Sequence, residues 1–288
     1  MMSFFRNLRL SLVSLIRIVL FSKWRGILKS TNSSKKSGCI IIGNGPSFKQ
    51  TIEQHGEHFQ NFDLVAVNNF ATSFYFEQLK PSYYIINATI LFLPDDKQSL
   101  LYQNMKREFF QHIVSKTTWD MEIMVPFMAK KSTDFQAILH QNNHLKPLYF
   151  NLESIEGFAF LKNRLFQLGL GCPRPHNVII PAIMNMMYLQ YKTIHVVGAD
   201  HSWLPQISVN EENIALVNQQ HFYDEQESKA APMQDRAQAR KLHEILEKFM
   251  LSFKGYWEIK AYAQSRGVSI YNSSEVSYID AFERKKWS

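Results

Sequence analysis

The chain has 288 residues, of which 45% are hydrophobic and 14% aromatic, so it can form one large α/β domain with a sizeable core. Residues 1–36 hold eight of the 32 basic residues and none of the 25 acidic ones, so the net charge of +7 is concentrated at one end. A protein that binds nucleic acid usually spreads positive charge over its folded domain, and no nucleic-acid partner is therefore expected.

The first predicted element is a helix within residues 4–24, which are at once apolar and basic. Arg6 and Arg17 lie opposite its apolar face, as in helices that lie in the plane of an anionic membrane surface. The apolar run is shorter than the roughly 20 residues that a spanning helix needs. We predict an interfacial anchor, with a spanning or signal anchor and an ordinary packing helix as alternatives. Five side chains form the apolar face: Leu8, Leu12, Leu15, Ile16 and Val19.

A polar linker closes this membrane-associating segment, 1–36, and the remainder, 37–288, is predicted to be one catalytic domain. Its cysteines, Cys39 and Cys172, have neither metal-ligand spacing nor a need to form a disulfide, so a reducing, cytosolic setting is the default. From residue 38 onward, strands alternate with helices, which predicts a doubly wound, mostly parallel, Rossmann-like sheet.

The predicted elements of this domain follow from hydrophobic runs and their breaks. Residues 201–234 form a long polar stretch, which favours an irregular lid or binding loop. Gly267 ends the last helix. Strands are expected at 39–43, 64–68, 83–87, 194–198 and, as the last strand, 268–271, with weaker candidates at 122–125 and 148–150. Helices are expected at 178–191, buried on all sides, and at 235–253, continued or repeated over 256–266.

Polar residues follow the predicted strands at their carboxyl ends, where doubly wound sheets bind ligands. Asn68, Asn87 and an asparagine in the first turn offer donors and acceptors without charge, which suits a nucleoside base and ribose. The first turn can also bring backbone close to a ligand and aim helix amides at a phosphate. The alternative is a tight turn with Ser47 as helix N-cap. The turn reads Gly43-Asn44-Gly45-Pro46-Ser47, and Gly198-Ala199-Asp200-His201 follows the strand at 194–198.

Several nucleotide-binding and hydrolase motifs are missing. The chain has no Gly-x-Gly-x-x-Gly, and Asn68 stands where an NAD site needs an acid. It has neither a P-loop nor a Gly-x-Ser-x-Gly elbow. It also lacks the Asp-x-Asp with which many nucleotide-sugar transferases hold a metal against a diphosphate. A nucleoside monophosphate leaving group, as in a CMP-sugar, fits that absence.

Five segments resemble the bacterial sialyltransferases represented by the Campylobacter lipooligosaccharide enzymes. Their order and rough spacing hold over residues 38–272. The first segment is shared with a wider group that includes flagellin-modification proteins and an archaeal pterin diphosphokinase, so it indicates the superfamily better than the reaction. The segments are Ile40–Lys49, Ala66–Phe70, Ile86–Asn87, Gln190–Asp200 and His221–Tyr223.

The resemblance implies a variant of the GT-A glycosyltransferase fold and a set of roles for individual residues. Asn44, Asn68 and Asn87 match nucleotide-binding asparagines, and His221 matches the general base. Asn177 stands where the family contacts the nucleotide. The nearest candidates for the family's phosphate-binding tyrosines are His201, Ser202, Trp203 and Tyr223. Asp200 fits a structural or ribose-contacting acid.

The reaction expected is metal-independent, inverting transfer from a CMP-linked sialic-acid-like sugar, another nonulosonate or Kdo. His221 would take the acceptor proton while Tyr223 or His201 donates to the departing phosphate. The lid at 201–234 would exclude water. No metal site or separate cofactor is expected. The partners would be the nucleotide-sugar donor, a glycan or glycolipid acceptor of lipopolysaccharide or capsule synthesis, and the cytoplasmic surface of the inner membrane. The resembling enzymes often form homo-oligomers.

Two other functions stay open at this point. The first is a Mg²⁺-dependent, diphosphokinase-like enzyme of the same fold, which would hold its metal with acids near strand ends such as Asp95, Asp96 or Asp200. The second is a non-catalytic, membrane-tethered nucleotide-binding or scaffold protein. Turnover and its dependence on Mg²⁺ would separate the three.

Overall fold

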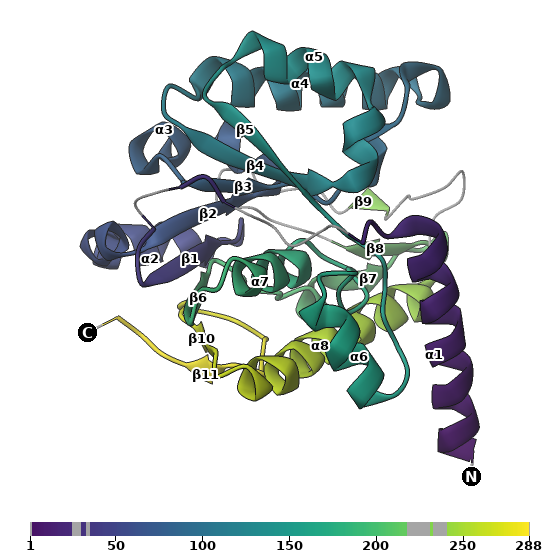
Figure 1. The fold of residues 1–288 in the computed structure, drawn as a ribbon. Helices are drawn as coiled ribbons and strands as arrows, with labels where there is room; N and C mark the ends of the chain where they lie inside the picture. Colours follow the sequence, from purple (N-terminus) through teal and green to yellow (C-terminus); the bar gives the residue numbers. More distant parts are fainter. Residues whose placement is uncertain (1, 25–29, 33–34, 218–230, 233–240, 288) are drawn as a thin grey trace.

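The computed structural model describes residues 2–24, 30–32, 35–217, 231–232 and 241–287, and it has one large sheet with helices on both faces (Figure 1). The sheet has eight strands in the order β11-β10-β6-β1-β2-β3-β4-β5, and every described pairing within it is parallel. The strands are β1 Gly38–Ile42, β2 Asp63–Val67, β3 Tyr83–Ile85, β4 Met121–Pro126, β5 Leu145–Phe150, β6 Thr193–Val197, β10 Ser269–Asn272 and β11 Glu283–Arg284.

The chain builds this sheet outward in two directions from β1. Strands β2 to β5 are added one after another on one side, and β6, β10 and β11 are added on the other. The strand order therefore reverses between β1 and β6, where the crossovers diverge and leave a crevice at the carboxyl ends of the strands. The predicted doubly wound α/β fold is confirmed.

Strand side chains alternate between two buried faces. Cys39 and Ile41 point to one face, and Ile40 and Ile42 point to the other. The first face is covered by α6 Ala159–Gln167, α7 Ile179–Tyr188 and α8 Leu242–Ser265. The second is covered by α2 Ser47–His55, α3 Tyr75–Leu79, α4 Leu100–Lys116 and α5 Thr133–Gln141. Short 3₁₀ helices lie at Gly56–Asn61, Asn68–Thr72, Thr89–Phe92, Asp95–Lys97, Phe127–Lys131 and Leu204–Gln206.

The predicted strands and the buried helix α7 are confirmed to within a few residues, and Gly267, with φ +60°, ends α8 as expected. The helix expected at 235–253 and continued or repeated over 256–266 is one continuous helix, α8, from residue 242; residues 235–240 lie outside the described part. The strand at 268–271 is not the last, because β11 follows it. Helices α3, α4, α5 and α6 were not predicted from the sequence: α4, for example, exposes Leu100 and Leu101, which blurs its apolar periodicity.

The segment expected to be an irregular lid contains regular structure. Three short antiparallel strands form a second sheet: β7 Ile207–Val209, β8 Ala215–Val217 and β9 Ala231–Pro232. Ala215 and Val217 of β8 are buried in a small cluster with Ile245 and Phe249 of α8. Because these apolar side chains are buried, the segment packs against α8. The polar composition of the segment does not indicate this contact.

The predicted N-terminal helix is present as α1 Met2–Phe21, which lies along the outside of the molecule (Figure 1). It contacts the body through one narrow face and exposes most of its apolar side chains. Within the described residues, no helix has both the length and the hydropathy to cross a bilayer.

Candidate functional site

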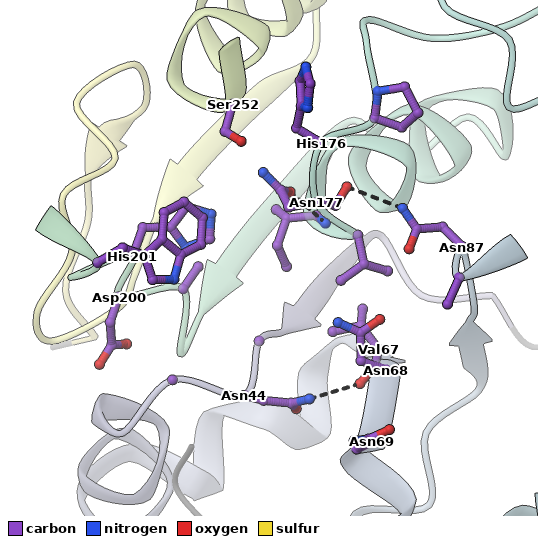
Figure 2. Close-up of a pocket in the computed structure, with 18 of the residues that line it drawn as sticks. Asn44, Val67, Asn68, Asn69, Asn87, His176, Asn177, Asp200, His201 and Ser252 are labelled. Carbon is purple, nitrogen blue, oxygen red and sulfur yellow. Dashed lines mark hydrogen bonds between the residues drawn. The ribbon is translucent and has the colours of Figure 1, made fainter. Parts of the chain in front are cut away.

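A cavity of about 660 Å³ opens at the carboxyl ends of the strands, beside the point where the strand order reverses (Figure 2). Its wall is formed by the turns after β1, β2, β3 and β6, the start of α7 and one face of α8. Eleven residues proposed from the sequence line it together: Gly43, Asn44, Gly45, Pro46, Asn68, Asn87, Asn177, Asp200, His201, Ser202 and Trp203.

Ser47 is the one described residue of the predicted site that is not in this wall. Ser47 lies behind it and bonds to Asp200. His221 and Tyr223, expected to carry the proton transfers, lie outside the described residues. Their roles stay predictions.

The turns after β1 and β6 are locked together and form the floor of the cavity. Gly45 N donates to Gly198 O at 2.7 Å. A Cβ on Gly43 would lie 2.5 Å from Gly198 O, and one on Gly45 would lie 2.5 Å from Asp200 Oδ1. Because both approaches are intramolecular, packing of one turn on the other explains why these two positions are glycine.

A carboxylate occupies the N-terminus of α2, where the sequence had indicated a phosphate. Asp200 Oδ2 accepts from Ser47 N at 2.9 Å, and Asp200 Oδ1 accepts from the Ser47 hydroxyl. Burial raises the pKa of Asp200, although its bonds to Ser47 act in the opposite direction. Ser47 is the first residue of α2, and Pro46 is its N-cap, so the alternative prediction of Ser47 as N-cap is wrong.

Asparagines from three neighbouring strands converge on the cavity. Asn44 Nδ2 donates to Val67 O at 3.2 Å, and its buried Oδ1 has no hydrogen-bond partner among the described residues. Asn68 has the left-handed φ of 50°, and its carbonyl accepts from the Tyr84 hydroxyl. Asn87 Nδ2 donates to Asn177 O at 3.4 Å, so it ties β3 to the start of α7 (Figure 2). Parallel strands bring these amides together because their carboxyl ends share one edge.

Asn177 stands at the N-terminus of α7 with its amide group fixed in one orientation. Its Oδ1 accepts from Ile179 N at 3.0 Å and Ile180 N at 3.2 Å, which caps the helix. Within the described part of the chain, its buried Nδ2 has no hydrogen-bond partner. The positive end of a ten-residue helix and an unused N–H donor therefore coincide at the wall of the cavity.

His201 belongs to a hydrogen-bonded chain that ends at Asn177. The Tyr256 hydroxyl donates to Asn177 Oδ1 at 3.1 Å, so His201 Nε2, at 2.5 Å from the Tyr256 oxygen, must be the donor in that bond. Burial lowers the pKa of His201 to about 3, which makes it neutral near pH 7. Trp203 stacks on its ring with centroids 4.1 Å apart. In this arrangement, Nε2 of His201 is occupied by Tyr256.

The sequence missed several residues of the wall. Lys248 and Ser252 are four positions apart, so they lie on the same face of α8, and Lys248 is the single Lys or Arg among the described lining residues. Their spacing is a signal, but nothing local to α8 says which side of the helix meets the cavity. Asn69 and His176 also line it. Among the described residues, no group of His, Cys, Asp or Glu has the arrangement of a metal site.

Comparisons with known proteins give a likeness in structure but none in sequence. No protein-family model and no curated protein sequence matches the chain. A solved structure described as the MAf glycosyltransferase from Magnetospirillum magneticum AMB-1 superposes with a TM-score of 0.48 at 8% sequence identity. The superposition covers 90% of this chain and 35% of that one, so this chain spans about a third of that protein's length.

Proposed function

We propose that this protein is a glycosyltransferase that takes a sugar from a nucleotide-linked donor, in particular a sialic-acid-like sugar from a CMP-sugar. The acceptor would be a cell-envelope oligosaccharide, and the reaction would be inverting and independent of a metal. The observation that carries the proposal is the meeting of Asn44, Asn68, Asn87 and Asn177 in one cavity at the reversal of strand order.

Two unused groups in that wall support a neutral, polar ligand portion. Asn44 Oδ1 can only accept, and Asn177 Nδ2 can only donate, and both are buried without partners in the described structure. Leaving such groups unmatched costs about 1–3 kcal/mol each. A nucleoside offers both kinds of partner, since its base and ribose carry donors and acceptors without charge.

The charge distribution of the wall supports a ligand with one phosphate. The ammonium of Lys248 and the positive end of α7 provide limited positive charge, and Asp200 is the single Asp or Glu among the described lining residues. Two of the three acids suggested for a Mg²⁺-dependent diphosphokinase have other partners: Asp95 bonds to Lys106 at 2.6 Å, and Asp200 bonds to Ser47. The third, Asp96, is exposed and is not among the described residues that line the cavity. These contacts favour the transferase over the diphosphokinase.

The proposed proton transfers involve residues from the 201–234 segment. His221 takes the proton of the acceptor hydroxyl, and Tyr223 donates to the departing phosphate. His201 is a positioning group. Its imidazole is neutral and its Nε2–H is already used in a hydrogen bond, so it orients Tyr256 and Asn177 through that Nε2–H. Closure of the segment excludes water from the sugar.

The test is donor hydrolysis by the purified protein in EDTA, with a panel of CMP-, UDP- and GDP-sugars and release of the nucleotide as the readout. We expect release of CMP alone, reduced about 10²- to 10⁴-fold in His221→Ala, as for loss of a general base. Asn87→Ala should weaken CMP binding measured by calorimetry. Asn104→Ala, on the exposed side of α4 and outside the cavity, is the matched control.

Two results would contradict the proposal. Activity that appears on a diphosphate donor or ATP only when Mg²⁺ is restored would assign the cavity to a diphosphokinase-like reaction. Tight CMP binding without turnover, even when extracts that contain acceptors are added, would assign the cavity to a nucleotide-binding scaffold. Near-wild-type turnover of His221→Ala would remove that histidine from the mechanism while leaving the donor assignment intact.

A further inference from the structure

Helix α1 is held to the body by a narrow polar seam. The Ser11 hydroxyl accepts from Phe158 N at 3.0 Å, and the Ser14 hydroxyl accepts from Glu156 N at 2.8 Å. The Ser22 hydroxyl, just past the helix, donates to Leu170 O at 2.7 Å. A Cβ on Gly157, whose φ is +110°, would lie 2.2 Å from Ser11 Oγ, so the loop touches the helix closely. These contacts therefore fix the orientation of α1 about its own axis.

In this orientation, the apolar arc of α1 faces away from the protein. The seam buries Ser11, Ser14 and Ile18, positions that share one face at 3.6 residues per turn. The adjoining arc is apolar and exposed, with Leu12 53% and Val19 68% accessible. A soluble helix docks with its apolar side inward; here the serines face the body. The exposed arc consists of Phe5, Leu8, Leu12, Leu15, Ile16 and Val19.

Basic residues border this arc on the side away from the seam. Arg6, Arg9 and Arg17 follow it around the helix, and no acid lies within residues 1–36. Charge of one sign beside a wide apolar arc complements a surface that is anionic outside and apolar beneath. It does not complement a second copy of the same arc, because the arginines would then face one another.

We infer that α1 is a docking surface for an anionic lipid bilayer, in which the apolar arc enters the acyl boundary and the arginines meet the headgroups. An aromatic group extends the surface beyond the helix: Phe158 lies 5.4 Å from Phe4 and 5.9 Å from Phe160 between ring centroids, and Phe160 is 75% accessible. The inference does not depend on the proposed reaction, since it uses none of the cavity residues.

The docking surface lies at the same edge of the sheet as the cavity. Asn151, directly after β5, accepts from Lys23 N at 2.8 Å and donates to Lys23 O at 3.0 Å. The loop that receives Ser22 at Leu170 continues to His176 and Asn177 in the cavity wall. A bilayer bound by α1 would therefore meet the edge of the protein where the ligand binds, which suits an acceptor carried on a lipid.

The test is cosedimentation of the full-length protein with vesicles of phosphatidylcholine alone and with phosphatidylglycerol added. We expect binding to the anionic vesicles, weakened by salt. The double variant Leu12→Glu/Val19→Glu should bind at least tenfold more weakly. Each Arg→Gln change at positions 6, 9 and 17 should weaken binding about fivefold. Leu100→Glu/Leu101→Glu is the matched control: both leucines are about as exposed, on α4, and should not contribute.

Three outcomes would overturn the inference. The wild-type protein could stay in solution with both kinds of vesicle. The control variant could lose binding as fully as Leu12→Glu/Val19→Glu. Finally, light scattering could show a dimer that Leu12→Glu/Val19→Glu splits, which would make a second copy the occupant of the arc. Nucleotide release in EDTA, measured on the same preparations, reports on the proposed reaction separately.

Discussion

The carboxylate of Asp200 accepts hydrogen bonds from both the backbone N–H and the hydroxyl of Ser47, a residue 153 positions earlier in the chain. This contact joins the turn after β6 to the first turn of α2. The two turns leave the neighbouring strands at which the sheet reverses its order, so the shape of the cavity floor depends on this pair.

Substitution of Asp200 tests how much stability the pair contributes. Asp200→Ala leaves the N–H and hydroxyl of Ser47 buried without an acceptor, and we expect the free energy of unfolding in urea to fall by about 2–4 kcal/mol. Asp200→Asn can bond both groups, because the Ser47 hydroxyl can accept from the new amide, and should cost about 1 kcal/mol. Equal losses in the two variants would show that the negative charge itself is required.

Gly45 should tolerate alanine less well than Gly267 does. A Cβ at Gly45 meets Asp200 and Gly198 O at 2.5 and 2.7 Å, and overpacking against such a turn costs about 2–3 kcal/mol. Gly267 has a φ of +60° and open space around its Cβ position, so Gly267→Ala has only the conformational cost of about 1 kcal/mol. Urea midpoints of the two variants make the comparison. Similar losses of stability in the two variants would mean that the turns after β1 and β6 can separate without strain.

Two buried histidines should make the protein less stable in mild acid. Burial lowers the pKa of His201 to about 3, and burial with the nearby charge of Lys285 lowers that of His195 to about 4. The unfolded chain takes up protons below about pH 6.5 while the folded chain does not. The free energy of unfolding therefore falls as the pH drops from about 7 toward 4, by at most about 1.4 kcal/mol per pH unit for each histidine.

The check is unfolding in urea at several pH values for the wild type and for His201→Gln and His195→Gln. Each variant should lose part of the acid-side slope. The raised pKa of Asp200 acts in the opposite direction, since it favours the folded state as the pH falls, and it cancels in the difference between variant and wild type. An unchanged slope in both variants would show that the histidines protonate in the folded protein.

Asn177→Asp separates the helix cap from the ligand contact. Aspartate keeps an oxygen for the N–H groups of Ile179 and Ile180, so thermal stability should stay within about 1 kcal/mol of the wild type. It replaces the unused Nδ2 donor with an acceptor, and we expect the affinity for CMP to fall at least about tenfold in calorimetry. Asn104→Asp, on α4, should change neither. Unaltered CMP affinity in Asn177→Asp would limit Asn177 to its structural role.

Lys248 should contribute to binding of the phosphate and not of the nucleoside. Lys248→Met removes the charge from the cavity wall, and we expect about tenfold weaker binding of CMP with little change for cytidine. Lys254→Met serves as the control, because Lys254 lies on the same helix but is exposed outside the cavity. An equal loss for CMP and cytidine would mean that Lys248 shapes the wall and does not contact the phosphate.

Most of the strands, and the polar residues that follow them, could be predicted from local sequence patterns. The apolar run at 39–42 and the similar runs around 65 and 195 predict buried parallel strands, because only a sheet covered on both faces buries such runs completely. Asn44, Asn68 and Asn87 could be assigned to one edge from their places after these strands. The amphipathic pattern of α1 was likewise visible in its spacing.

The tertiary structure alone decided which distant groups meet. Asp200 with Ser47, His201 with Tyr256, and Lys248 with the cavity wall depend on the order of strands in the sheet and on the rotation of α8, which no local pattern encodes. The serine seam of α1 depends on a loop about 140 residues away along the chain. Local propensity is set by neighbours in sequence, whereas these contacts are set by how whole elements bury their faces against one another.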